Sequence, residues 1–284
     1  MKKISLFTDA FLIFTLALLF SLVSCVENSL PAKMTIDTEK DRAAYGNEIK
    51  ITPMNDSVTV TKNEITFAPE HEGEIYYISG YFKGQLISKT KNTVLRFDNA
   101  YIEYDRGKAA VKCSAKTEIS AAPNSVNYIV SRGRSFSKNA ALQGKRGITL
   151  GGSGSLYIVG GVCHGLEADD VKIKGSGNFY IQGESKGSAI SCGSLEVDPD
   201  KSFNCYLINS KNGIKAEGTI KIASGNFYLY NNKTALRTEI SKKTSAKARA
   251  IMLSGGIFHT FENQRLYITN DGAYNGAGAT FIED

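Results

Sequence analysis

Short runs in which apolar and polar residues alternate fill most of the chain after residue 47. Early examples are Glu48-Ile49-Lys50-Ile51, Ser57-Val58-Thr59-Val60 and Glu64-Ile65-Thr66-Phe67. Alternation with a period of two is typical of a β-strand with one buried face. Helical periodicity does not extend over a useful length here, and 27 glycines against 5 prolines indicate turns led by glycine. The pattern predicts an all-β fold.

A small residue followed by an aliphatic one recurs at a constant step, and a strand-like run with a central tyrosine follows each copy. The four pairs are Ala141-Leu142, Gly165-Leu166, Ala189-Ile190 and Gly213-Ile214. A fixed period of this size is typical of a solenoid, in which each repeat buries its apolar face against its neighbours. Coils of about 22–26 residues with several short strands predict a parallel β-helix. We expect outer copies at Ala110-Val111 and Ala250-Ile251.

The N-terminus has a different pattern, with a basic start, an apolar run up to Val23 and then Leu22-Val23-Ser24-Cys25. This arrangement resembles a bacterial lipoprotein signal rather than a membrane span; an ordinary secretory signal with an incidental cysteine is the alternative. We predict a signal peptide over residues 1–24, a lipid on Cys25, a polar tether over 25–47 and one β-helix domain over 48–284. Val26 is not the aspartate that retains lipoproteins in the inner membrane, so we expect an outer-membrane lipoprotein facing the periplasm or the outside.

The formal charge of +6 favours acidic partners only weakly. Nucleic acid is a poor partner for an exported lipoprotein, and we expect a monomer that meets the membrane only through its lipid. Cys113 and Cys192 fall at one core position of the repeat, where we place Ala168, Ala216 and Leu253 in other copies. We therefore expect buried free thiols at Cys113, Cys163, Cys192 and Cys205, although an exported protein permits disulfides.

Tyrosines stand at the centre of the strand-like runs, between residues that point into the core. On a strand, each tyrosine then points outward, and stacked coils bring the tyrosines into a ladder. The predicted ladder is Tyr157, Tyr180, Tyr206, Tyr228 and Tyr267. Rings with a polar tip are good platforms for sugar rings. Alternatively, the tyrosines only stack on one another and stabilise the strands.

An acidic cluster of Glu167, Asp169 and Asp170 follows the first corner of the repeat, and such oxygen-rich groups can hold calcium. One period earlier lie Lys145 and Arg146, so ion pairs between neighbouring strands are the alternative explanation.

The candidate chemistry for an enzyme is sparse. A lyase of this fold needs a basic residue beside acidic calcium ligands, and Lys172 and Lys174 near Asp170 are the arrangement to test. The histidines lie in no metal-ligand spacing. Basic residues gather in or near two insertions, where they are either solvated or able to meet the carboxylates of an acidic glycan: Arg132, Arg134, Lys138, Lys242, Lys243, Lys247 and Arg249.

The runs that begin GYFKGQLISK at residue 80 and AALQGKRGIT at residue 140 resemble the bacterial carbohydrate-binding domain-containing proteins, from about Glu48 to about Phe258. The resemblance implies a right-handed β-helix like that of polysaccharide lyases, and binding of plant-type or acidic polysaccharides with calcium but no established lyase reaction. In that family, an aspartate before each corner helps to bind calcium. This chain has His164, Ser188 and Asn212 there instead, which weakens the calcium expectation.

The leading functional hypothesis is a surface-anchored, non-catalytic lipoprotein that binds acidic or plant-type polysaccharide. A structural or adhesive protein that binds host or neighbouring proteins is the alternative, and a polysaccharide lyase is the third.

Overall fold

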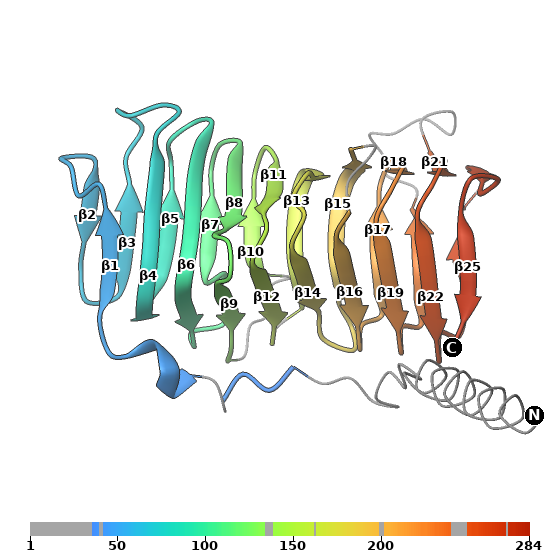
Figure 1. The fold of residues 1–284 in the computed structure, drawn as a ribbon, viewed down its shortest axis with the longest axis horizontal. Helices are drawn as coiled ribbons and strands as arrows, with labels where there is room; N and C mark the ends of the chain where they lie inside the picture. The colour runs from blue at the N-terminus through green and yellow to red at the C-terminus, as the bar shows by residue number, and fades with distance from the viewer. Residues whose placement is uncertain are drawn as a thin grey trace, which may run out of the picture. The chain divides into compact units, whose positions relative to one another are not determined.

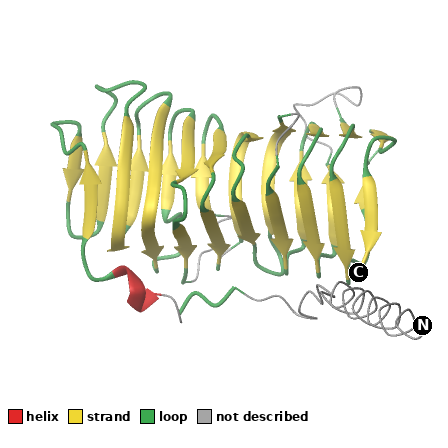
Figure 2. Ribbon diagram, viewed as in Figure 1, coloured by secondary structure: helices red, strands yellow, loops and turns green. Residues whose placement is uncertain are grey.

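The computed structural model describes residues 36–39, 42–133, 139–161, 163–198, 202–239, 249–270 and 272–284. The predicted signal peptide, Cys25 and the first part of the predicted tether lie outside these residues. Residues Thr35–Asp284 form one compact unit. Its described part consists of strands and one short 3-10 helix, η1 (Arg42–Tyr45), which confirms the predicted all-β class (Figure 2). None of the helices in the described ranges is long and apolar enough to cross a membrane.

Most strands pair in parallel with the strand one repeat further along, and they form three ladders (Figure 1). The first ladder contains β3 (Glu64–Phe67), β5 (Gln85–Ser88), β7 (Val111–Cys113), β10 (Ala140–Gly144), the starts of β13 (His164–Ile173) and β15 (Ser188–Val197), β17 (Asn212–Ala216), β20 (Thr234–Thr238) and β23 (Tyr267–Ile268).

The second ladder contains the starts of β4 (Ile75–Lys83) and β6 (Thr93–Tyr104), β8 (Thr117–Ala121), β11 (Ile148–Gly152), the ends of β13 and β15, β18 (Thr219–Ile222), β21 (Ala250–Leu253) and β24 (Ala273–Asn275). The third ladder contains the ends of β4 and β6, then β9 (Val126–Ser131), β12 (Ser155–Gly160), β14 (Asn178–Gln182), β16 (Asn204–Ile208), β19 (Asn226–Tyr230), β22 (Ile257–Phe261) and β25 (Thr280–Glu283).

Two strands at the N-terminal side of the stack run the other way. β1 (Ile49–Thr52) pairs antiparallel with the middle of β4, over residues 77–80, and β2 (Val58–Val60) pairs antiparallel with β3. They occupy backbone groups that would otherwise be available for pairing with another chain.

The predicted repeat is confirmed in the first ladder. Leu142 pairs with Leu166, Leu166 with Ile190, and Ile190 with Ile214, so the constant step in the sequence is the step from strand to strand. The outer copy at Ala110-Val111 is also confirmed, because Val111 pairs with Leu142.

The outer copy at Ala250-Ile251 was assigned to the wrong strand. Ile251 pairs with Ile220 in the second ladder, while the partner of Ile214 is Leu236. The two ladders carry similar apolar runs, and an insertion between β20 and β21 shifts the apparent repeat. The same shift removes Leu253 from the position assigned to it, because Leu253 pairs with Ile222.

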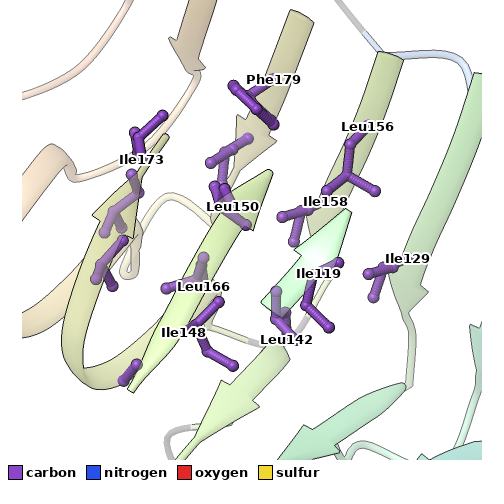
Figure 3. Packing of buried hydrophobic residues seen from close by; sticks show 14 of the residues in the cluster. Ile119, Ile129, Leu142, Ile148, Leu150, Leu156, Ile158, Leu166, Ile173 and Phe179 are labelled. Carbon is purple, nitrogen blue, oxygen red and sulfur yellow. The ribbon is translucent and has the colours of Figure 1, made fainter. Parts of the chain in front are cut away.

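Strands of all three ladders contribute alternate residues to one hydrophobic core (Figure 3). In β12, for example, Leu156 and Ile158 are fully buried, whereas Tyr157 between them is half-buried on the outside. Burial of a large apolar side chain stabilises a fold by about 1.5–3 kcal/mol. Because each coil covers the next, the contribution is repeated along the stack.

The four described cysteines, Cys113, Cys163, Cys192 and Cys205, are buried, and Cys113, Cys192 and Cys205 form no disulfide, as predicted. Cys113 and Cys192 occupy equivalent positions of the first ladder, along with Ala168 and Ala216. Burial raises the pKa of the Cys113 thiol to about 12, so the thiol stays protonated and packs as a small apolar group.

Candidate functional site

The outer face of the third ladder carries the predicted row of tyrosines. Tyr157 pairs with Tyr180, Tyr180 with Tyr206, and Tyr206 with Tyr228, so the four side chains occupy equivalent places on β12, β14, β16 and β19. These four strands follow one another along the ladder (Figure 1). The residues on either side of each tyrosine are buried and the tyrosine itself is partly exposed. The predicted outward ladder is confirmed for these four residues.

The rings in this row stack face to face on one another. Their centroids lie 4.2 Å apart between Tyr157 and Tyr180, 4.4 Å between Tyr180 and Tyr206, and 4.3 Å between Tyr206 and Tyr228. The ring planes differ by 2° to 9°. Each inner ring therefore has both faces covered by its neighbours, so the row offers solvent its ring edges and hydroxyl groups. A sugar cannot lie flat on the face of Tyr180 or Tyr206.

Tyr267 does not belong to this row. It pairs with Leu236 in the first ladder and stacks on Tyr274 at 4.0 Å. The residue that follows Tyr228 in the third ladder is His259, which stacks on Tyr228 at 4.6 Å with a 9° interplanar angle. The sequence interpretation matched Leu-Tyr-Ile to the repeat by letters, whereas the equivalent run here is Phe-His-Thr.

The row also extends toward the N-terminus, which the sequence interpretation missed. Tyr128 pairs with Tyr157, Tyr101 with Tyr128, and Tyr81 with Tyr101. The centroid distances grow from 4.6 Å to 5.1 Å and then 5.9 Å in that order. The alternation in VNYIVS and AYIEY was the available signal, but these coils do not follow the constant step of the central repeats.

A segment from the predicted tether covers this N-terminal end of the row. We call it the strap and define it as the described residues Ile36–Glu39 and Arg42–Tyr45. Tyr45 meets Tyr101 and Tyr128 edge-on at 5.5 and 5.9 Å and donates a hydrogen bond to the Val126 carbonyl at 2.8 Å. The strap is therefore packed against the strands, and the tether ends earlier than predicted.

Charged groups hold the strap at one side of the row. The Arg132 guanidinium pairs with the Glu39 carboxylate at 2.8 Å and with the Glu103 carboxylate at 3.4 Å, and it donates to the Thr38 hydroxyl at 2.8 Å. Arg42 pairs with Glu103 at 3.6 Å. The Glu103 side chain is 4% exposed, and these cations compensate its buried charge.

A second row runs beside the open tyrosines. Asn178, Asn204 and Asn226 precede Tyr180, Tyr206 and Tyr228 by two residues and share their outer face. The Asn204 amide donates to Asn178 at 2.9 Å, and the Asn226 amide donates to Asn204 at 3.1 Å. An asparagine amide has two donors and two acceptor sites, so these bonds leave capacity on each side chain for a further partner.

The tyrosine row also changes the acidity of Tyr206. Partial burial raises the pKa of the Tyr206 hydroxyl, and the neighbouring Tyr180 and Tyr228 raise it further. The Tyr206 hydroxyl is therefore neutral at physiological pH, and it both donates and accepts hydrogen bonds.

The acidic residues predicted to hold calcium have other partners or face solvent in the structure. Throughout the described ranges, no three His, Cys, Asp or Glu side chains gather closely enough to hold a metal ion. The Asp170 carboxylate accepts a bond from the Ser194 hydroxyl at 2.6 Å, and the Glu167 carboxylate accepts one from the Gln143 amide at 3.3 Å. Asp169 is exposed. As placed, these groups do not fit a calcium ion, so calcium stays a prediction of the resemblance.

The alternative ion pairs involve other residues than predicted. Among the described residues, no ion pair joins Lys145 or Arg146 to Asp169 or Asp170. Lys172 instead pairs with Asp198 at 2.7 Å, and Lys174 pairs with Glu118 at 2.6 Å. The ion pair with Asp198 raises the pKa of Lys172. Both ammonium groups are therefore engaged with carboxylates.

The residues that replace the corner aspartates have a structural place. His164, Ser188 and Asn212 are all buried. The backbone amide of Ser188 donates to His164 Nδ1 at 2.9 Å, and the Asn212 amide donates to the Ser188 hydroxyl at 3.0 Å. These side chains therefore link successive coils. Of the basic residues predicted for an acidic glycan, Arg132 lies at the strap, Arg249 is buried, and the other five lie outside the described residues.

Comparisons with known proteins agree with this description of the fold. A family model described as carbohydrate-binding domain-containing protein matches residues 54–187, which confirms the predicted resemblance over just under half of the chain. This range includes Tyr157 and Tyr180. A search of curated proteins gives no match. A solved structure of the polysaccharide lyase-like protein from C. thermocellum, a gadolinium derivative, aligns with a TM-score of 0.64 and 19% identity, over 81% of this chain and 91% of that chain. At this identity the likeness shows a shared fold.

Proposed function

We propose that the protein is a surface lipoprotein that binds polysaccharide without cleaving it, through the outer face of the third ladder. The observation that carries the proposal is the open row of Tyr157, Tyr180, Tyr206 and Tyr228, repeated in register with an asparagine row beside it. The description of the matching family supports the same ligand class.

The stacked rings favour recognition through hydroxyl groups. Ring edges and phenol groups recur once per coil, at steps of 4.2–4.4 Å, with an amide next to each of the last three. A polysaccharide that lies along the stack meets the same donors and acceptors at each coil. Each neutral hydrogen bond to a sugar hydroxyl contributes only about 0.5–1.5 kcal/mol, so affinity depends on many contacts made together. A polymer should therefore bind much better than its monosaccharide.

The wider setting of this face also belongs to the proposal. The three parallel ladders and the fold shared with the polysaccharide lyase-like protein support a right-handed parallel β-helix. A lipid on Cys25 would anchor this body to the outer membrane. We propose no catalytic step, because Lys172 and Lys174 are paired with carboxylates.

The test is retention of the mature chain on affinity gels and glycan arrays of acidic and neutral polysaccharides, with and without a chelator. A triple variant, Tyr180→Phe, Tyr206→Phe and Tyr228→Phe, keeps the stacked rings and removes three hydroxyl groups. We expect it to fold normally and to bind about tenfold or more weakly, as the loss of three hydrogen bonds implies.

The matched control is the double variant Tyr267→Phe and Tyr274→Phe, which makes the same change on a stacked pair outside the third ladder. Its binding should equal that of the wild type. Retention of no glycan by the wild type would overturn the proposal, and full binding by the triple variant would remove the tyrosine row from it.

One observation favours protein binding as a second candidate function. The strap is a polypeptide segment, and it lies on the same face that is open further along. A peptide array probed alongside the glycan array separates the two functions. Binding of peptides alone, lost in the triple variant, would replace polysaccharide with protein as the partner.

A further inference from the structure

The contacts of the strap resemble those of a bound acidic sugar. The Glu39 carboxylate lies 2.8 Å from the Arg132 guanidinium, in the manner of an arginine that binds a carboxylate ligand. Beside it, the Tyr45 ring covers Tyr101 and Tyr128 in edge-on contacts. A uronate unit likewise combines a carboxylate with a ring that carries hydroxyl groups, as the Glu39 carboxylate and the Tyr45 ring do together.

The strap is held weakly for a segment that covers buried side chains. Of its described residues, only Thr38 is buried, and η1 buries none. Ile36 and Tyr45 are the apolar side chains that pack on the row. The Glu39 side chain is 66% exposed and that of Arg42 45%, so salt and water screen their ion pairs. Segments with few buried apolar contacts open at low cost.

Opening the strap leaves a complete site behind. Glu39 and Arg42 depart together, so Arg132 loses one carboxylate partner and Glu103 loses one cationic partner. Arg132 and Glu103 remain paired, and Tyr81 continues to donate to Glu103 at 3.1 Å. Glu103 thus orients the guanidinium, whose Nη2 donor is released from Thr38 and Glu39. Tyr101 and Tyr128 are uncovered as the direct continuation of the row that begins at Tyr157.

We propose that Arg132, Tyr101 and Tyr128 form a binding site for a carboxylate-bearing sugar, and that the strap occupies this site until such a sugar displaces it. The proposal rests on the proposed function and names acidic polysaccharide as its ligand class. The carboxylate replaces that of Glu39 on Arg132, and the chain of sugars continues along the open tyrosines. Neutral polysaccharides use the open row and leave the strap in place.

The test uses Glu39→Gln in the mature chain, which removes the carboxylate that occupies Arg132. Glu72→Gln is the matched control, because Glu72 makes an exposed ion pair with Lys91 at 3.5 Å. The first measurement needs no glycan: tetranitromethane nitrates accessible tyrosines, and mass spectrometry reports Tyr101 and Tyr128. We expect their nitration to rise about two- to fivefold in Glu39→Gln, because the loss of one exposed ion pair increases the population with an open strap by about that factor. It should stay unchanged in Glu72→Gln.

The second measurement is binding of oligogalacturonate and of neutral cello-oligosaccharide. Glu39→Gln should bind oligogalacturonate about two- to fivefold more tightly, with no change for the neutral ligand. Arg132→Gln should lose the advantage of the acidic ligand over the neutral one, and Arg132→Lys should restore part of it.

The outcomes separate this inference from the proposed function. If the wild type retains glycans but Glu39→Gln changes neither nitration nor acidic binding, the second site is wrong and the open row stands. If nitration rises in Glu39→Gln but no variant binds oligogalacturonate, an acidic ligand is excluded here. If no glycan binds to any variant, both proposals fail.

Discussion

The tyrosine row has a covered end and an open end, although every member occupies the same place on its strand. Tyr101 and Tyr128 are 0% and 2% exposed, whereas Tyr157 to Tyr228 are partly exposed. The difference comes from the strap, in which the Thr38 carbonyl, 63 residues before Tyr101 in sequence, accepts a hydrogen bond from the Tyr101 hydroxyl. Ring order differs too: neighbouring planes differ by 2° to 9° at the open end and by 22° between Tyr101 and Tyr128.

One type of side chain therefore has two roles within a single ladder. At the covered end, tyrosine is a core residue of a small outer cluster with Val130, Ile36 and Tyr45. At the open end, it is a surface residue whose ring faces are covered by its neighbours and whose outer edge is available to a ligand. Variants at the two ends measure this contrast directly.

The largest contrast is expected for removal of the ring. Tyr101→Ala leaves a cavity beneath the strap and should lower the free energy of unfolding by about 3 kcal/mol, as large-to-small changes in a core do. Tyr180→Ala removes a partly exposed ring and should cost about 1 kcal/mol. Chemical denaturation of both variants checks this. Equal losses would mean that the strap contributes no packing.

Removal of the hydroxyl alone should give a smaller contrast. The Tyr101 hydroxyl donates to the Thr38 carbonyl at 2.6 Å, so Tyr101→Phe should lower the free energy of unfolding by about 1 kcal/mol. Tyr180→Phe should leave it within about 0.5 kcal/mol of the wild type. The same denaturation series tests the pair, and a large loss in Tyr180→Phe would contradict a solvent-facing hydroxyl.

Alkaline pH tests the electrostatics of both ends. Burial raises the pKa of Tyr101 and of Tyr206, and the neighbouring tyrosines add to the shift of Tyr206. A pKa raised in the folded state stabilises the fold fully below the unfolded value of about 10 and loses that contribution as the pH rises beyond it. Stability should therefore fall above about pH 10. The melting temperature should fall less steeply with pH in Tyr206→Phe and in Tyr101→Phe than in the wild type. If the melting temperatures of wild type and variants fall in parallel, the raised tyrosine pKa values are not the cause.

The smallest effect is expected at the acidic corner, which serves as a reference away from the row. Glu167, Asp169 and Asp170 do not gather into a metal site among the described residues. Adding a chelator should therefore leave the thermal midpoint unchanged, both in the wild type and in Asp170→Asn. A clear drop in the wild type that Asp170→Asn abolishes would restore calcium to this corner.

How far the fold could be predicted from the sequence depended on the regularity of the coil. Where the repeat period is constant, the period alone predicts that Leu142, Leu166 and Ile190 pair with one another on successive strands. After Ile214 the repeat becomes shorter, because Ile214 pairs with Leu236, and an insertion then separates β20 from β21. The period therefore predicts the wrong ladder for Ala250-Ile251, since Ile251 pairs with Ile220. Turns absorb changes in length without disturbing the strands, which is why a period alone loses the register there.

For the candidate site, too, the sequence predicted the regular part of the row and missed the rest. Alternation along a strand identified the outward tyrosines of the open end, because it depends only on local geometry. It could not show that their faces cover one another, since ring spacing follows from the distance between coils and the rotamers chosen in the stack. The run Leu266-Tyr267-Ile268 resembles the repeated signature and therefore predicts a member of the row at Tyr267. The structure places His259 at the position that follows Tyr228.

Local alternation and repetition along the chain were enough to determine the all-β class, the period, the inward residues and four members of the tyrosine row. The contacts of Glu39 with Arg132 and of Tyr45 with Tyr101 were decided by the folded arrangement alone, and so was the covered end of the row. Such contacts join residues far apart in sequence through packing and charge, and no periodicity records them.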